Sequence, residues 1–303
     1  MWSKFKNPVI LWEKGNVINF RRLCHVTYFE LKRMLFRKPY IAEIDVTSKC
    51  NLRCRQCFYF KKPEYIPKEE VDIETWKTKL TSLYDQGIRR LCLVGGEPAL
   101  RMEIIELANG LFPYIDICSN GLIKIPEHIN HRIFISIDGN DDYNQEYRSR
   151  QIMDAIAGNY YNDKRVVILM TLNGKNYNQI NEVAEYAIKN KIDSLVFSLY
   201  TPFSEDDEVY FDENTRQDII ESIKKSKKKY PKLLKVSPFV LNWYARGNHK
   251  NKCYWRDNVK HYNAVLEERK ACLSMNCQYC GYFSGANIAP LNMLYIANKK
   301  INK

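Results

Sequence analysis

The chain has 303 residues and carries 47 basic against 35 acidic side chains, a net charge of +12. A hydrophobic content of 45% and a charged content of 27% are ordinary for a globular protein and exclude global disorder. No stretch approaches the roughly 18 apolar residues of a membrane span, and the apolar run at 8–12 is too short for a secretory signal. We therefore expect the ten cysteines to stay reduced in the cytoplasm, where clustered thiols favour metal binding over disulfides.

Residues 1–39 are basic and aromatic, and apolar residues recur at helical spacing over 17–36. This pattern predicts one amphipathic helix that ends before Pro39. The apolar face also contains Cys24 and His25, so it is not cleanly divided, and this favours packing onto the rest of the protein. Peripheral association with a membrane surface is the alternative.

From Tyr40 onward, strand and helix patterns alternate. Short runs rich in Ile, Val and Leu are typical of a parallel sheet buried on both faces. They predict strands at 40–46, 89–94, 114–118, 132–137, 165–172 and 194–199. Helical patterns lie between them at 73–86, 101–111, 142–159 and 178–190. The alternation predicts an α/β fold of right-handed βαβ units, either a partial (β/α)6 barrel or an open parallel sheet. In both, ligands gather at the carboxyl ends of the strands.

The pattern changes after Pro202. Residues 212–230 predict a surface helix, and the lysine run at 224–229 is most simply its solvated face. Residues 231–303 show no clear βαβ unit. We therefore expect three parts, which are an N-terminal helical extension (1–39), a barrel core (40–202) and a small C-terminal module (203–303).

Three cysteines, Cys50, Cys54 and Cys57, follow the first predicted strand. Thiols at this spacing can bind one metal ion or one metal cluster if the loop curls around it. Three thiolates without a fourth ligand suit an iron–sulfur cluster with one open iron better than structural zinc, which takes four ligands.

This spacing resembles the signature of the radical S-adenosylmethionine (SAM) superfamily. Further motifs of that superfamily follow in its order at the strand ends, namely Gly95-Gly96-Glu97-Pro98, Ser119-Asn120-Gly121, Ser136-Ile137-Asp138-Gly139 and Asn173. Taken singly, each is also typical of a turn or a helix cap, but jointly they favour the functional interpretation. Many members carry an aromatic residue or histidine at the position of Gln56. This departure affects the expected contact with the adenine of SAM and leaves the cluster ligands unchanged.

The resemblance implies an enzyme in which Cys50, Cys54 and Cys57 hold a catalytic 4Fe–4S cluster. The cluster and SAM would supply a 5′-deoxyadenosyl radical that abstracts hydrogen from a substrate. The electron would come from a donor such as flavodoxin or ferredoxin. The residues implied to bind SAM are Gly95, Gly96, Glu97, Pro98, Ser119, Ser136, Asp138, Arg148 and Asn173. The glycine pair permits close backbone approach to the ammonium group.

A second group contains Cys253, Cys272, Cys277 and Cys280. It resembles the shortened auxiliary-cluster modules, of twitch or SPASM type, that follow the barrel in many radical SAM enzymes. Glu267 stands where those modules often carry a glycine. The resemblance implies a second 4Fe–4S cluster, while zinc or a cluster with three cysteine ligands remains the alternative.

The other cysteines are isolated. Cys92 and Cys118 lie in predicted strands and fit small buried hydrophobes. A spare cysteine of the second group would be the first candidate to return a hydrogen atom to the substrate, which would make the enzyme an epimerase. Cys118, beside Ser119, is the second candidate donor.

The charge of +12 favours acidic partners such as phosphorylated small molecules or anionic lipid surfaces. No basic and aromatic pattern resembles a nucleic-acid module.

The substrate class stays open between a sugar, nucleoside, lipid or peptide, and the reaction between oxidation and epimerisation. No separate peptide-recognition domain of ~80 residues precedes the first strand, which lowers the case for a ribosomal peptide. The competing hypothesis is a non-catalytic iron–sulfur or zinc protein on the same barrel.

Overall fold

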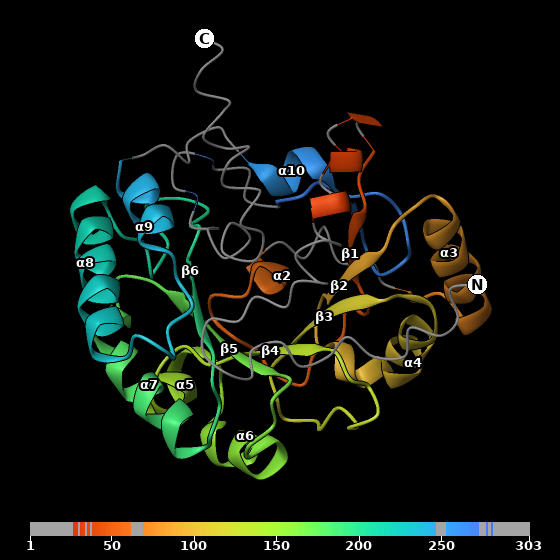
Figure 1. Cartoon of the computed structure of the whole chain (residues 1–303). Helices are drawn as coiled ribbons and strands as arrows, with labels where there is room; N and C mark the ends of the chain where they lie inside the picture. Colours follow the sequence, from red (N-terminus) through yellow and green to blue (C-terminus); the bar gives the residue numbers. More distant parts are fainter. Residues whose placement is uncertain are drawn as a thin grey trace.

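A computed structural model describes residues 27–29, 31–33, 35–36, 38–61, 69–246, 253–272, 277 and 280. Seven strands of this part form one all-parallel sheet in the order β6-β5-β4-β3-β2-β1-β7. They are β1 (Ile41–Asp45), β2 (Arg90–Val94), β3 (Tyr114–Ser119), β4 (Arg132–Ser136), β5 (Val166–Leu172), β6 (Leu195–Leu199) and β7 (Val259–Tyr262). The edge strands β6 and β7 do not pair with each other, so the described sheet is an open arc (Figure 1). The predicted α/β fold with a partial barrel is confirmed.

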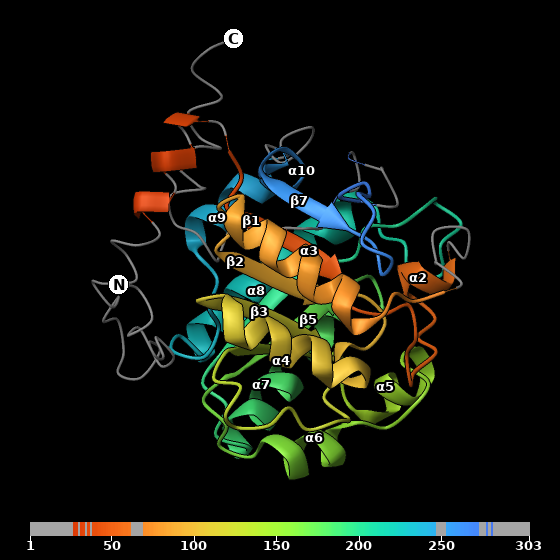
Figure 2. The same cartoon turned by 90° about the vertical axis from the view of Figure 1, so that its right-hand side faces the viewer.

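Helices cover the outer side of the arc (Figures 1 and 2), and the short helix α2 (Phe58–Lys61) lies past one end of the strands (Figure 2). The outer helices are α3 (Ile73–Asp85), α4 (Met102–Leu111), α5 (Asp141–Tyr147), α6 (Met153–Tyr160), α7 (Ile180–Lys189) and α8 (Glu213–Lys229). Two more helices follow, α9 (Pro238–Ala245) and α10 (Tyr254–Asn258).

Alternate residues of each strand point toward the outer helices and form the main core. Ile44, Leu93 and Ile117 are fully buried there with Trp76 and Leu80 of α3. We call the opposite side of the sheet, which points away from these helices, the inward face. Cross-strand register places on it a row of side chains that consists of His261, Glu43, Cys92, Asp116 and Arg132.

The predicted helix 142–159 is wrong, because the chain forms two helices there. Ser149 has a φ of 63°, which ends α5. The Asp141 carboxylate then accepts the backbone N–H groups of Ile152 (2.9 Å) and Met153 (3.0 Å) at the start of α6. The break leaves Arg148 at the end of α5, beside the cysteine loop.

Strand β7 was missed from the sequence and joins the C-terminal segment to the sheet. Val259 is opposite Ile41 in the register with β1. Arg269 strengthens this attachment, since its Nη2 donates to Glu43 Oε1 (2.9 Å) and to Asp45 Oδ1 (2.8 Å). The segment with the second cysteine group is therefore fixed to the strand that precedes the first group. The predicted domain boundaries stay predictions.

Part of the predicted N-terminal helix lies outside the described residues. Residues 27–29, 31–33 and 35–36 are helical, and Leu31, Leu35 and Phe36 are more than half exposed. Within the described ranges, no helix has the length and apolar character needed to cross a membrane.

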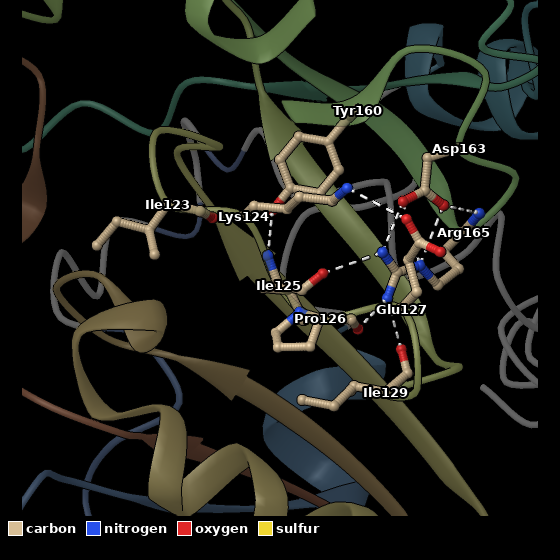
Figure 3. Close-up of polar contacts among 9 residues, drawn as sticks. All are labelled: Ile123, Lys124, Ile125, Pro126, Glu127, Ile129, Tyr160, Asp163 and Arg165. Carbon is tan, nitrogen blue, oxygen red and sulfur yellow. Dashed lines mark hydrogen bonds and ion pairs between the residues drawn. The ribbon is translucent and has the colours of Figure 1, made fainter. Parts of the chain in front are cut away.

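Arg165 braces the loop between β3 and β4 (Figure 3). Its guanidinium donates to the carbonyl oxygens of Ile125 (3.0 Å), Pro126 (2.6 Å) and Ile129 (2.8 Å). The same group pairs with Asp163 at 2.6 Å, and its side chain is only 6% exposed. One buried cation thus donates to three loop carbonyls at once and ties the loop to the residue that precedes β5.

We predict that Arg165→Met lowers the free energy of unfolding by about 3 kcal/mol, because the largely buried Asp163 carboxylate loses its countercharge and three loop carbonyls each lose a donor. Urea denaturation measures this change. The matched control is Lys164→Met, which removes an exposed charge paired with Asp193 and should cost less than about 1 kcal/mol. Equal losses in the two variants would contradict the bracing role.

Candidate functional site

The cysteine loop leaves the carboxyl end of β1 and is held by α5. Cys50, Cys54 and Cys57 are half-buried, and the backbone N–H of Arg55 donates to the Tyr147 carbonyl at 2.9 Å. Burial raises the pKa of all three thiols, that of Cys54 to about 11. The charges of Cys57 and Cys50 contribute to the raised pKa of Cys54. A metal that binds here must therefore displace protons from the thiols.

The Gly95-Gly96 pair lets the turn after β2 touch the start of the cysteine loop. The backbone N–H of Gly96 donates to Thr47 O at 2.7 Å, and that of Glu97 donates to Lys49 O at 2.9 Å. Gly95 has a φ of 117°, and a Cβ on it would lie 2.7 Å from Thr47 O. A Cβ on Gly96 would overlap the Lys49 carbonyl. Both positions require glycine for steric reasons.

Glu97 ties the end of β2 to the end of β3. Its carboxylate is 1% exposed and accepts from Ala99 N (3.0 Å), Ser119 Oγ (2.8 Å) and Asn120 N (2.7 Å). Burial raises the pKa of Glu97, and these donors oppose that shift. The side chains of Glu97 and Ser119 are thus already used in hydrogen bonds within the protein.

Asp138 connects the cysteine loop to the ends of β4 and β5. Its Oδ2 accepts from Gln56 Nε2 (2.9 Å) and Arg148 Nη1 (2.6 Å), and its Oδ1 accepts from Thr171 N (2.8 Å). Asn173 Nδ2 donates to Gln56 Oε1 at 2.9 Å. The Gln56 amide is therefore held between two of the predicted SAM-binding residues, a role that the sequence did not reveal.

Arg148 carries an unsatisfied donor at this site. Burial opposes its charge, but the Asp138 carboxylate raises the pKa of Arg148 above its ordinary value. The thiols of Cys54 and Cys57 add to the same shift, so the guanidinium lies near the cysteines. Its Nε is buried and has no hydrogen-bond partner among the described residues. A buried donor without a partner suits a bound anion.

Cys118 and Ser136 lie at the carboxyl ends of β3 and β4. Both are half-buried, and Cys118 packs with Phe134, Val167 and Val196 on the inward face. Burial raises the pKa of the Cys118 thiol, so this thiol retains its hydrogen at neutral pH.

The second cysteine group is described only at its four cysteines and at 254–271. Cys253 caps α10, and its Sγ accepts from Arg256 N at 3.3 Å. A hydrogen bond to Asp257 is the largest cause that raises the pKa of Arg256, and the thiols of Cys253 and Cys277 contribute to the same shift. These two cysteines therefore lie near one guanidinium. Cys280 is half-buried, and Cys272 is exposed.

The donor chemistry fits a cluster better than a single ion. A single zinc ion needs its thiolates within about 2.3 Å of one point, whereas a 4Fe–4S cluster takes each thiolate on a different iron. Three neighbouring thiols, a close glycine turn and the unsatisfied Arg148 Nε suit a cluster with an anionic co-ligand.

Comparison with known proteins decides the family. The family model described as the radical SAM superfamily matches residues 44–241, which is more than half of the chain. The chain belongs to the radical SAM superfamily. This superfamily uses a 4Fe–4S cluster and SAM, as the cysteine triad and strand-end motifs predicted.

Relatives and solved structures of the superfamily resemble parts of the chain. The sporulation killing factor maturation protein SkfB of Bacillus subtilis is 28% identical over 48% of this chain and 39% of its own length. A probable GTP 3′,8-cyclase of Archaeoglobus fulgidus is 28% identical over 47% of this chain and 53% of its own. The chain thus matches about half or less of these relatives.

Among solved structures, Streptococcus suis SuiB bound to its precursor peptide SuiA has a TM-score of 0.60 at 15% identity. The alignment covers 88% of this chain and 69% of SuiB. At this identity the similarity shows the fold of the radical SAM barrel.

We predict that Gly96→Ala lowers the free energy of unfolding by about 2 kcal/mol, because the added methyl group overlaps the Lys49 carbonyl. It should also lower the iron bound per chain after reconstitution, since the cysteine loop must shift. The control is Gly110→Ala in α4. A Cβ at this position meets nothing within 4 Å, so this substitution should stabilise the fold by roughly 0.5–1 kcal/mol. Urea unfolding and iron analysis measure both effects, and full iron binding by Gly96→Ala would argue against this steric requirement.

Proposed function

We propose that this chain is a radical SAM enzyme that abstracts hydrogen from a substrate bound on the inward face of the sheet. The observation that carries the proposal is the direct bonding of the cysteine loop to the ends of β2, β4 and β5 through Gly96, Glu97 and Gln56. This network gathers the superfamily motifs at one edge of the sheet. When bound, the cluster and SAM supply a 5′-deoxyadenosyl radical at this edge.

Each motif has a role that its contacts allow. Cys50, Cys54 and Cys57 bind three irons. Arg148, with its unsatisfied Nε, binds the SAM carboxylate. The carbonyl oxygens of residues 95–98 accept the ammonium group, since the Glu97 carboxylate is taken up by three internal donors.

The remaining predicted residues orient the nucleoside part of SAM. Ser136 presents its hydroxyl at the end of β4 for the ribose. Asp138, Ser119 and Asn173 are buried and act by holding the strand ends and the cysteine loop in place. Gln56, between Asp138 and Asn173, fixes the loop next to the adenine.

The substrate class that we favour is a peptide. SkfB is named as a maturation protein, and SuiB was solved with a precursor peptide. The relatives named GTP 3′,8-cyclase favour a nucleotide as the second candidate. An oxidation would require an acceptor for the electron that the substrate radical loses. An epimerisation would instead require a donor that returns a hydrogen atom to the substrate radical. For epimerisation, Cys118 is a candidate because its thiol lies half-buried on the inward face.

We also propose that Cys253, Cys272, Cys277 and Cys280 bind an auxiliary 4Fe–4S cluster. The attachment of their segment to β1 through β7 and Arg269 supports this role, because it sets the cysteines in a constant position relative to the barrel. Electron supply by flavodoxin or ferredoxin, and membrane contact through residues 1–39, stay predictions.

Anaerobic incubation of the reconstituted chain with SAM and dithionite should produce 5′-deoxyadenosine. Cys50→Ala, Cys54→Ala and Cys57→Ala should each reduce product to background, because the cluster loses an iron ligand. Cys92→Ala, which removes a cysteine that lies away from the loop, is the matched control and should retain the activity. A loaded wild-type cluster that forms no 5′-deoxyadenosine would favour the non-catalytic alternative.

Reconstituted wild-type chain should contain about eight irons and eight sulfides, as two 4Fe–4S clusters require. The double variant Cys277→Ala/Cys280→Ala should contain about four, while Cys92→Ala should match the wild type. Iron, zinc and sulfide analysis measures this. About four irons in the wild-type chain, or stoichiometric zinc, would exclude the auxiliary iron–sulfur cluster.

A further inference from the structure

Arg216 is a buried cation in the part of the chain that follows β6. It lies near the start of α8, and its side chain is only 2% exposed. The other long side chains that this helix buries are apolar, namely Ile219, Ile220 and Ile223. Helix α8 packs against α9 (Figure 1). A guanidinium in such a position needs partners from other segments, because burial of an unpaired charge is costly.

The guanidinium of Arg216 joins α8 to α9 and to the second cysteine group. Its Nη1 donates to the hydroxyl oxygen of Tyr244 at 3.0 Å and to the backbone carbonyl of Cys280 at 3.2 Å. The guanidinium carbon lies 5.3 Å from the centre of the Phe211 ring and 5.4 Å from that of Tyr244. Arg216 thus holds the backbone of a cysteine that follows it by 64 positions in the chain.

The positive charge of Arg216 is weakly balanced in the described part of the chain. Glu213 Oε2 is 3.5 Å from Nε, and this glutamate is 52% exposed, so water screens much of the ion pair. Nε is buried and has no hydrogen-bond partner among the described residues. Tyr244 supplies no countercharge, because burial raises the pKa of its phenol and keeps it neutral.

Two other buried arginines show the usual way to balance such a charge. Arg148 pairs with Asp138 and Arg165 pairs with Asp163, and both carboxylates are at most 13% exposed. Arg216 has no comparably buried carboxylate beside it among the ion pairs of the described residues. A further anion next to the Cys280 backbone would balance the buried charge.

We propose that Arg216 is a positioning residue for the auxiliary cluster, which holds the Cys280 backbone in place and balances the negative charge of the bound cluster. This inference rests on the proposed auxiliary 4Fe–4S cluster and deepens it. Four thiolate ligands give such a site a net negative charge. Net charge and nearby hydrogen bonds set the reduction potential of iron–sulfur clusters. Because a nearby positive charge favours the form with one more electron, Arg216 raises this potential.

The test isolates the auxiliary cluster in the full-length chain. The parent chain carries Cys50→Ala, Cys54→Ala and Cys57→Ala, which remove the ligands of the catalytic cluster. After reconstitution it should contain about four irons. A potentiometric titration, followed by electron paramagnetic resonance of the reduced cluster, then measures the reduction potential.

Arg216→Gln removes the charge and keeps a neutral donor for the Cys280 carbonyl. At a fixed potential the ratio of reduced to oxidised cluster should fall about tenfold, which is a shift of about 59 mV to lower potential. A unit charge at roughly 10 Å and an effective dielectric constant of about 20 has an effect of this size. Arg216→Lys keeps the charge and should retain most of the potential. The control Lys225→Met removes an exposed charge further along α8 and should leave the potential unchanged.

Equal potentials in the parent chain and in Arg216→Gln would overturn the proposal, and so would an equal shift in Lys225→Met. Thermal melts decide the case of a variant that binds little iron. Arg216→Gln should lower the melting temperature of the reconstituted chain more than that of the iron-free chain, because the charge stabilises the bound cluster. Equal losses, or an iron-free variant that does not fold, would assign Arg216 to the fold alone and also overturn the proposal.

The iron content of the parent chain separates this inference from the proposed auxiliary cluster. A parent chain that binds zinc or no iron would reject the auxiliary cluster itself. Four irons in the parent chain, with the same potential after Arg216→Gln, would reject only the role of Arg216.

Discussion

Two buried carboxylates, those of Glu97 and Asp138, hold the loops of the candidate site together. A carboxylate removed from water is tolerated only when donors surround it, and each of these accepts three hydrogen bonds. The donors come from different strand ends and, for Asp138, from Gln56 of the cysteine loop. The cost of leaving either carboxylate unsatisfied therefore fixes the relative positions of these loops before any cofactor binds.

The inward face of the sheet divides chemically along its strands. Its amino-terminal end on β2–β4 carries the ion pairs of Arg90 and Arg132 with Asp116, and its middle is formed by apolar side chains such as Phe134 and Val167. The cysteine loop and Arg148 lie at the other end.

Much of the fold could be predicted from the sequence because buried parallel strands are short, continuous apolar runs. All six strands from 40 to 199 were found in this way. Strand β7 was missed because Val259-Lys260-His261-Tyr262 is short and half polar, and only its register with β1 reveals it. The single helix predicted at 142–159 was wrong because its break depends on one residue, Ser149, and on a side-chain cap from Asp141.

The sequence by itself determined the superfamily, the α/β class and the cysteines that the motifs imply, because these depend on spacing along the chain and on local burial. The tertiary structure alone decided which side chains meet. The bonds of Gln56 to Asp138 and Asn173, and the sharing of Asp116 by Arg90 and Arg132, join residues from separate strands and loops. No local pattern encodes such contacts, since they arise only when the register of a parallel sheet brings distant segments side by side.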